Sequence, residues 1–214
     1  MKKTVLVLAG APASGKGTLK TQLIKEFEKT NIEYTVIETS SILKKDKKFQ
    51  SIIATGKLVN DQDVIDAIKE PLEEAEGIII LDGFPRTYPQ VDFLIGIDFF
   101  KLKVLKLNAD NESIIKRAES RRVCPKCGDT YNLLEKKLQP KVEGICNICG
   151  TPLEMREDDA RIRSRLETYQ KETMPAIQYL VEYFNTPYYE VDSNQILKDG
   201  FAEKLLTELG IESM

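Results

Sequence analysis

A glycine-rich loop that contains one lysine is the first feature of the chain that could perform chemistry. Residues 10–16 read Gly-Ala-Pro-Ala-Ser-Gly-Lys, after an apolar run and before a segment with helical spacing of its apolar residues. Backbone N–H groups of such a loop, with the positive end of the following helix, can surround a phosphate chain whose outer oxygens Lys16 reaches. The usual Ser or Thr after the lysine is replaced by Gly17, so the next hydroxyl is that of Thr18. The loop therefore predicts a phosphate-binding site.

An aspartate and a group of arginines could complete a site for phosphoryl transfer. Asp82 directly follows the apolar run 78–81, where the carboxyl ends of parallel strands line a ligand crevice, and its carboxylate could hold magnesium through water. All eight arginines lie between Arg86 and Arg165, although lysines dominate the rest of the chain. Arginine makes bidentate contacts to phosphate, and phosphoryl transfer needs positioning and charge neutralisation more than acid–base groups. We expect three of the eight to lie on the surface: Arg122, Arg161 and Arg163.

Four cysteines form two C-x2-C pairs that are separated by eighteen residues: Cys124, Cys127, Cys146 and Cys149. This spacing is typical of two knuckles that hold one tetrahedral zinc ion through four thiolates. Such a site leaves no coordination position open, so its zinc would stabilise the segment and take no part in catalysis. Two disulfides, or iron in the same ligand set, are the alternatives.

The composition of the 214 residues restricts the possible classes of protein. With 42% hydrophobic and 30% charged residues, the chain has the make-up of a soluble globular protein, and no window is apolar enough to cross a membrane. Histidine is absent, which excludes histidine acid–base catalysis, Ser-His-Asp and Cys-His nucleophiles and histidine metal sites. The net charge of -3 argues against a broad nucleic-acid surface. Residues 1–13 superficially resemble a signal peptide, but their short apolar core leads into the loop, so we expect a cytoplasmic protein.

Strand-like and helical segments alternate along the chain and must position these groups. Short apolar runs predict strands at 5–9, 34–37, 78–81, 104–107 and 188–191. Helical spacing predicts helices at 18–29, 41–54, 61–75, 112–122, 160–184 and 201–209. The alternation implies an α/β fold in which a parallel sheet carries helices on both faces. The segment 123–152, which holds the cysteines, breaks this alternation and is predicted to be an inserted subdomain.

Taken together, these motifs resemble the adenylate kinase family over nearly the whole chain, in its long form with a zinc-binding lid. The resemblance rests on the loop 10–18, on Gly56-Lys57-Leu58-Val59, on the signature Asp82-Gly83-Phe84-Pro85-Arg86-Thr87 with Gln90, and on the arginines that flank the cysteine segment. It implies a P-loop core with a five-stranded parallel sheet at 1–38, 70–122 and 153–214, a helical nucleoside-monophosphate-binding domain at 39–69 and a lid at 123–152. It also implies reversible transfer of the γ-phosphate of Mg-ATP to AMP, which gives two ADP.

The resemblance further implies a role for each matching residue. On the ATP side these are Ala13, Ser14, Gly15, Lys16, Gly17, Thr18, Arg121, Thr130, Tyr131 and Gln195. On the AMP side they are Thr39, Lys44, Lys57, Leu58, Val59, Gly83, Phe84, Pro85, Arg86, Gln90, Arg156 and Arg165, with Gln90 pairing with an adenine edge. The residues implied in catalysis are Lys16, Asp82, Arg86, Arg117, Arg121, Arg156 and Arg165, with Asp82 positioning magnesium. The expected protein is a monomer with structural zinc that takes small nucleotides and neither nucleic acid nor membrane as partners.

Four features of the chain depart from the family pattern. Ala13 stands where many members have glycine, and we expect the loop to tolerate its methyl group. Ser40-Ser41 replaces the usual Gly-Asp and removes a carboxylate that helps to organise magnesium waters. Lys44 replaces an arginine on the phosphate of the monophosphate, which keeps the charge but loses the bidentate geometry. Two residues are missing between Asp159 and Arg165, so Arg163 is the alternative if the register moved.

These departures leave other functions open. The acceptor could be CMP, UMP or GMP, although Gln90 and the segment 56–59 favour AMP. A different class is a catalytically weakened nucleotide-binding protein whose lid serves a partner. A zinc-dependent nucleic-acid binder is disfavoured by the negative charge and by the few aromatic residues of the knuckles.

Overall fold

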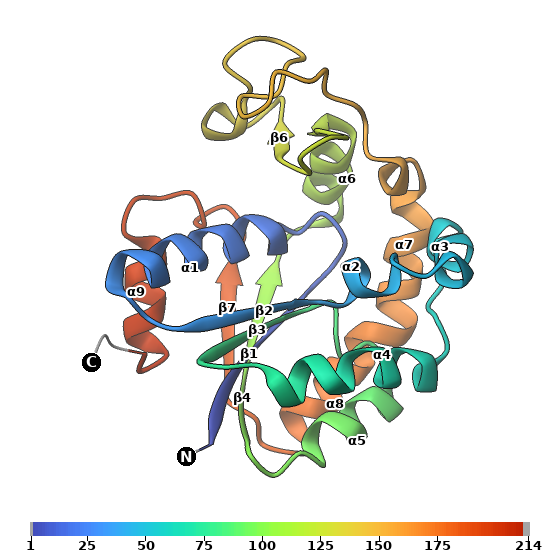
Figure 1. Ribbon diagram of the computed structural model, residues 1–214, viewed down its shortest axis with the longest axis vertical. Helices are drawn as coiled ribbons and strands as arrows, with labels where there is room; N and C mark the ends of the chain where they lie inside the picture. Colours follow the sequence, from blue (N-terminus) through green and yellow to red (C-terminus); the bar gives the residue numbers. More distant parts are fainter. Residues whose placement is uncertain (1, 212–214) are drawn as a thin grey trace.

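A five-stranded parallel sheet forms the centre of the molecule (Figure 1). The computed structural model describes residues 2–211. The strand order is β2-β3-β1-β4-β7, and every neighbouring pair is parallel. The strands are β1 Lys3–Gly10, β2 Tyr34–Glu38, β3 Ile78–Asp82, β4 Phe100–Asn108 and β7 Tyr188–Asp192. The predicted α/β fold with a five-stranded parallel sheet is confirmed, and β4 is longer than the predicted 104–107.

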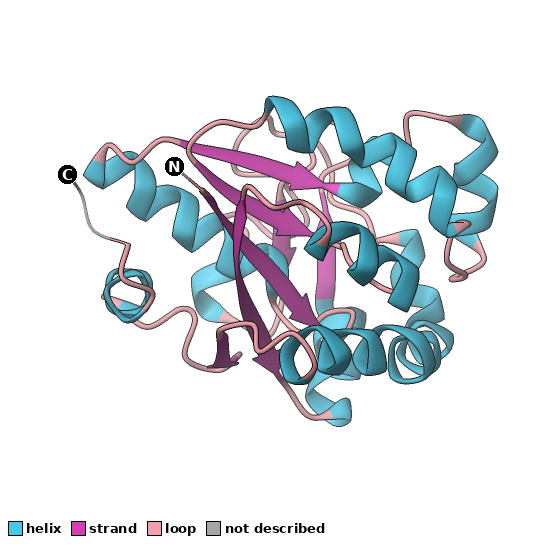
Figure 2. Cartoon of the chain, turned by 90° about the horizontal axis from the view of Figure 1, so that it is seen from below, coloured by secondary structure: helices cyan, strands magenta, loops and turns pink. Residues whose placement is uncertain are grey.

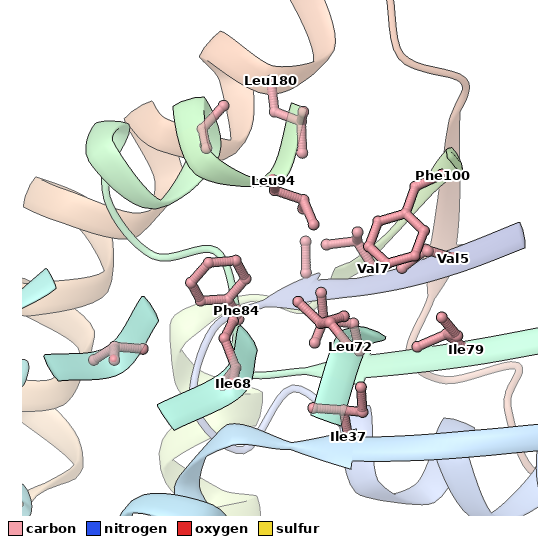
Figure 3. Packing of buried hydrophobic residues seen from close by; sticks show 14 of the residues in the cluster. Val5, Val7, Ile37, Ile68, Leu72, Ile79, Phe84, Leu94, Phe100 and Leu180 are labelled. Carbon is pink, nitrogen blue, oxygen red and sulfur yellow. The ribbon is translucent and has the colours of Figure 1, made fainter. Parts of the chain in front are cut away.

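Helices cover both faces of the sheet, as Figure 2 shows, and this explains the continuous apolar runs of the strands. Successive strand side chains point to opposite faces, so Val5 and Val7 of β1 pack on one face and Leu6 and Leu8 on the other. The first face, drawn in Figure 3, also carries the helices α4 Asp61–Glu74, α5 Tyr88–Ile95 and α8 Met174–Glu182. The second face carries α1 Lys16–Thr30 and α9 Phe201–Glu208.

Two predicted helical segments differ in detail from the observed ones. The segment 41–54 contains two short helices, α2 Thr39–Leu43 and α3 Lys47–Ala54. The chain is extended at Asp46, whose side chain caps the second helix by accepting a hydrogen bond from the Lys48 amide. The predicted helix 160–184 begins with a 3-10 turn at Glu157–Arg161 and continues as α7 Ile162–Thr168, a π-helical turn at Tyr169–Thr173 and then α8. The π turn ends two residues before Pro175, which lacks the N–H that a regular helix would require there.

The cysteine segment lies outside the sheet, beyond α6 Asn111–Ser120 (Figure 1). Its regular structure consists of a short antiparallel pair, β5 Arg121–Val123 with β6 Thr130–Asn132, and a 3-10 turn at Lys136–Leu138. Isolated bridges from Val123 to Glu154 and from Ile145 to Pro152 tie the remaining loops together. Among residues 2–211, none of the helices has the length and apolar character that a membrane span requires.

Candidate active site

A large cleft lies at the carboxyl ends of the strands, between the sheet and the cysteine segment. Its volume is about 1850 Å³. In Figure 1 the arrowheads of β4 and β7 point toward this side of the molecule. The central strand β1 has β3 on one side and β4 on the other, so the connections leave β1 toward opposite sides of the sheet. Open α/β sheets bind ligands beside such a reversal, at the carboxyl ends of the strands.

Most of the predicted nucleotide-site residues line this cleft. They are Ala13, Gly15, Lys16, Gly17, Thr18, Thr39, Lys44, Lys57, Leu58, Val59, Asp82, Gly83, Phe84, Pro85, Arg86, Gln90, Arg117, Arg121, Thr130, Tyr131, Arg156 and Arg165. Two predicted contacts do not line it. Ser14 is buried beneath the loop, with only 1% of its surface exposed, and the Gln195 side chain donates a hydrogen bond to Asp192 at 3.2 Å.

The glycine-rich loop leaves the beginning of α1 open toward the cleft. Gly15 precedes the helix with a φ of 103°, no side chain caps the helix, and its first turn contains no acidic residue. Its first N–H groups are therefore free to bind an anion. The Lys16 Nζ donates to the carbonyl oxygens of Gly10 at 2.6 Å and Ala11 at 2.8 Å. The side chain of Lys16 thus points back toward the first residues of the loop.

Ala13 adopts the left-handed conformation, with a φ of 59°. For a residue with a Cβ atom, this conformation costs about 1–2 kcal/mol. The methyl group packs against the apolar cluster that includes Ala11, Ile114 and Ile162. The loop therefore holds Ala13 in a conformation that glycine adopts without this cost.

Burial is the main cause of an unusual charge state at Lys16. Desolvation lowers its pKa to about 7; the charges of Arg86, Arg165 and Arg121 add to this effect, while Asp82 opposes it. Burial likewise lowers the pKa of Arg86, and it lowers that of Arg165 to about 10. The positive groups come from four separate parts of the chain and interact electrostatically within one cleft. Such a site favours a multiply charged anion.

A pair of carboxylates lies at the ends of β2 and β3. Glu38 and Asp82 are register partners, and the Lys20 ammonium lies between them, 2.6 Å from Glu38 Oε2 and 3.0 Å from Asp82 Oδ2. Burial by itself would lower the pKa of Lys20 and raise that of Glu38. The attraction between the opposite charges outweighs burial, so the pKa of Lys20 is raised by Asp82 and Glu38, and the pKa of Glu38 is lowered by its hydrogen bond from Lys20. Sequence analysis missed Lys20 and Glu38. Glu38 carries the same signal as Asp82, since each ends an apolar strand.

The acceptor side of the cleft is built around Arg86. Its Nε donates to the Gly83 carbonyl at 2.8 Å, and a Cβ atom at position 83 would lie 3.0 Å from Arg86 Nη2. Thr39 is 3% exposed and lines the cleft, and its Oγ1 has no hydrogen-bond partner in the part of the chain that the structure describes. A buried hydroxyl of this kind is suited to a ligand oxygen.

Acidic residues hold the arginines that flank the cysteine segment. Arg121 makes two hydrogen bonds to Asp159, one of them from Nε at 2.7 Å, and Arg165 lies 3.8 Å from the same carboxylate. Arg156 and Lys44 both contact Asp158, at 3.0 and 3.3 Å.

The structure separates the two candidates for the shifted register. Arg165 lines the cleft, whereas Arg163 is exposed and does not. Arg161 is also exposed, as expected, and Arg122 is half-buried and lies outside the cleft lining. Arg117 is held from the other side by Ser193 Oγ and Asn194 Oδ1, each at 2.8 Å.

The four cysteines converge on one point although their pairs are far apart in sequence. All four are free thiols, and their sulfur atoms lie within 4.8 Å of one another. The Sγ–Sγ separations are 3.4 Å for Cys124–Cys149, 3.5 Å for Cys127–Cys146 and 3.7 Å for Cys127–Cys149. A tetrahedral ion with metal–sulfur bonds of about 2.3 Å has edges of about 3.8 Å, so this donor set fits such an ion. The disulfide alternative does not describe this structure.

Tyr131 connects the cysteine cluster to the cleft. It is buried with Cys124 and Cys146, and its hydroxyl lies 3.5 Å from the Cys146 sulfur and accepts a hydrogen bond from the Asn147 amide at 2.8 Å. The Tyr131 hydroxyl is therefore engaged inside the cysteine segment, and only the ring and backbone of Tyr131 remain for the predicted ATP contact.

Comparison with known proteins places these features in one family. A family model described as adenylate kinase matches residues 8–186. The chain belongs to the adenylate kinase family. It is 36% identical to an adenylate kinase of Finegoldia magna over 95% of this chain and 98% of that protein, and 36% identical to one of Petrotoga mobilis over 91% and 92%. An adenylate kinase of Ruminiclostridium cellulolyticum is 37% identical over 81% of this chain and 86% of its own length.

Because adenylate kinases bind ATP, the lowered pKa of Lys16 can be tested through the protons that are taken up when ATP binds. Phosphate groups beside Lys16 would raise its pKa from about 7, so ATP binding at pH 8 should take up close to one proton. Because the bound form has the higher pKa, binding weakens as the pH rises above 7. Calorimetric titration in two buffers with different ionisation enthalpies measures this uptake.

The Lys16→Arg variant is the control, since a guanidinium stays protonated in both the free and the ATP-bound protein. ATP binding to this variant should be accompanied by no proton uptake at position 16. Equal proton uptake by both proteins would assign the proton to another group.

Proposed function

We propose that the protein transfers the γ-phosphoryl group of ATP reversibly to AMP and so produces two ADP. The observation that carries this proposal is the cleft itself. A phosphate loop lines one side, Thr39, Gly83 and Arg86 line the other, and buried positive side chains lie near enough to influence one another's pKa values. Two anionic substrates could meet there with their phosphates between these cations.

The residues act by positioning and by neutralising charge. The α1 amides and Lys16 bind the ATP phosphates, and Arg86 with Thr39 holds the AMP phosphate. The AMP phosphate oxygen attacks the γ-phosphorus while the bond from that phosphorus to the β–γ bridging oxygen breaks, and ADP remains on each side. Arg121, Arg156 and Arg165 stabilise the charge on the transferring group. No general base is required because the attacking oxygen is already ionised.

The paired carboxylates Glu38 and Asp82 fit a magnesium ion that is held through water. Oxygen donors of this kind are the ligands that magnesium prefers, and Lys20 shows that the pair already binds a cation. Magnesium would shield the charge of the β- and γ-phosphates. We propose that Glu38 replaces the carboxylate that Ser41 lacks.

We further propose that the cysteine cluster binds structural zinc and that the protein acts as a cytoplasmic monomer. Four free thiols with tetrahedral separations support zinc, and free thiols suit a reducing compartment. Both nucleotide sites are lined by one chain, which supports a monomer.

The choice of acceptor is tested by mixing the protein, magnesium and ATP with AMP, CMP, UMP or GMP and separating the products by chromatography. We expect conversion of AMP with little product from the others. Preference for another acceptor would assign a specificity role to Ser40, Ser41 and Lys44, and no transfer to any would indicate a nucleotide-binding protein without catalysis.

Lys16→Met should lower kcat by about 100-fold or more, because a charge that neutralises the phosphates is lost. Steady-state kinetics checks this. Lys29→Met, an exposed position on the same helix, is the control and should retain activity. Similar activity of the two variants would contradict the role of Lys16.

Glu38→Gln should weaken magnesium-dependent ATP binding by about tenfold, as removal of an outer carboxylate does at other metal sites. Magnesium titrations followed by calorimetry with ATP measure the change. Glu28→Gln removes an exposed carboxylate outside the cleft and should leave the titration unchanged. An unaltered magnesium dependence of Glu38→Gln would leave Asp82 as the only carboxylate of the site.

Zinc removal by a chelator, or Cys146→Ser, should lower the melting temperature by about 10 °C and reduce activity in parallel. Calorimetry and metal analysis of the same sample check this. Ile148→Ala changes an exposed, non-ligating residue of the same knuckle and provides the control. A metal-free protein with full stability would refute a structural ion, and metal analysis distinguishes zinc from iron.

A further inference from the structure

The Gln90 amide is held at both of its ends. Gln90 lies in α5, is 2% exposed and lines the cleft. Its Oε1 accepts the Arg86 backbone N–H at 2.8 Å, and its Nε2 donates to Asp61 Oδ1 at 2.8 Å. The Thr87 hydroxyl donates to the same Asp61 oxygen at 2.6 Å. Asp61 begins α4 and is not among the residues that line the cleft.

These partners determine which end of the amide is oxygen and which is nitrogen. A backbone N–H can only donate a hydrogen bond, and a carboxylate can only accept one. Rotation of the Gln90 amide by half a turn would point its NH₂ group at the Arg86 N–H and its oxygen at Asp61. Both contacts would become repulsive in a buried site where water cannot replace them.

One donor and one acceptor of Gln90 remain for a ligand. A primary amide has two N–H groups and two oxygen lone pairs, and the protein uses one of each. The remaining pair has a fixed order, with the acceptor on the Arg86 side and the donor on the Asp61 side. A base edge can bind both the Gln90 oxygen and the Gln90 NH₂ group only if the donor of the base faces the oxygen and the acceptor of the base faces the NH₂ group.

The four common bases divide into two groups on this criterion. Adenine and cytosine present an amino donor next to a ring nitrogen that accepts, which matches the amide. Guanine and uracil present a carbonyl acceptor next to a ring N–H, which reverses the order and sets acceptor against acceptor. Cytosine is smaller than adenine, so it reaches the amide less well from the same ribose position.

We propose that Asp61 is a positioning residue for acceptor choice: together with the Arg86 N–H it fixes the orientation of the Gln90 amide and thereby selects acceptors whose base carries an amino group over those whose base carries a carbonyl group at that edge. This proposal rests on the proposed function. It assigns specificity to a residue outside the cleft, because the order of donor and acceptor at Gln90 depends on what lies behind it.

Asp61→Asn tests the proposal, since an Asn side chain can donate as well as accept and so no longer opposes the rotated amide, which only the Arg86 N–H then resists. We expect kcat/KM for AMP to fall. The ratio of kcat/KM for AMP to kcat/KM for GMP or UMP should narrow by about tenfold or more. The loss should lie mainly in the KM for the acceptor, with the KM for ATP unchanged. Calorimetric titration with AMP and GMP provides a readout that does not depend on catalysis.

Thr87→Val is the matched control. It removes the second donor to Asp61 and leaves the Asp61–Gln90 contact in place, so the acceptor ratio should stay near that of the native protein. If Asp61→Asn does not fold, Asp61→Ala replaces it, because it removes the acceptor of the Gln90 NH₂ group and the same narrowing is expected.

The outcomes separate this proposal from the proposed function. A native protein that converts AMP, together with an Asp61 variant whose acceptor ratio is unchanged, would overturn the role of Asp61 and leave the kinase activity standing. Equal losses with every acceptor would also overturn it, since they indicate a structural role alone. A native protein that transfers to no acceptor would remove the proposed function, whatever the variants bind.

Discussion

The concentration of positive charge in one buried cleft is the constraint on which the rest of the site depends. Lys16, Arg86 and Arg165 lose water contacts there, and burial lowers the pKa of each. Buried charges are unfavourable unless opposite charges compensate them. In the free protein, Asp82, Asp158 and Asp159 supply part of this compensation, through ion pairs or electrostatic attraction. A polyphosphate would supply the rest of the compensating negative charge. The free energy of its binding therefore depends on how much of the positive charge these acidic residues already compensate.

The parallel sheet makes this concentration of charge possible. Because all five strands run in the same direction, the carboxyl ends of β1, β2 and β3 meet at one edge, where β2 ends in Glu38, β3 ends in Asp82 and the loop after β1 leads to Lys16. The helices on both faces bury the apolar strands and hold that edge in place. Arginines from α6 and α7 then approach the edge from outside the sheet. The site combines strand ends with groups on the segments that connect to the cysteine segment.

Local patterns were sufficient for much of the prediction. The phosphate loop needs only a strand, a turn and a helix that are adjacent in sequence, and the two C-x2-C pairs carry their spacing within short knuckles. The strands were found because burial on both faces leaves continuous apolar runs. The cluster of Lys20, Glu38 and Asp82 was missed because it depends on the register between β2 and β3, and no local pattern encodes that register. The π turn before Pro175 was missed for a similar reason, since helical spacing does not distinguish it.

Residue types and short-range spacing therefore account for the fold class, the phosphate loop and the set of four thiols, because each arises from interactions between residues close in the chain or from burial alone. The folded chain adds the pairings that span long distances in sequence. Arg165 rather than Arg163 lines the cleft because α7 presents that side to the sheet edge. Asp61 accepts a hydrogen bond from Gln90 because α4 and α5 pack side by side on the same face. Contacts of this kind depend on how elements are placed relative to one another, and that placement is a property of the whole core.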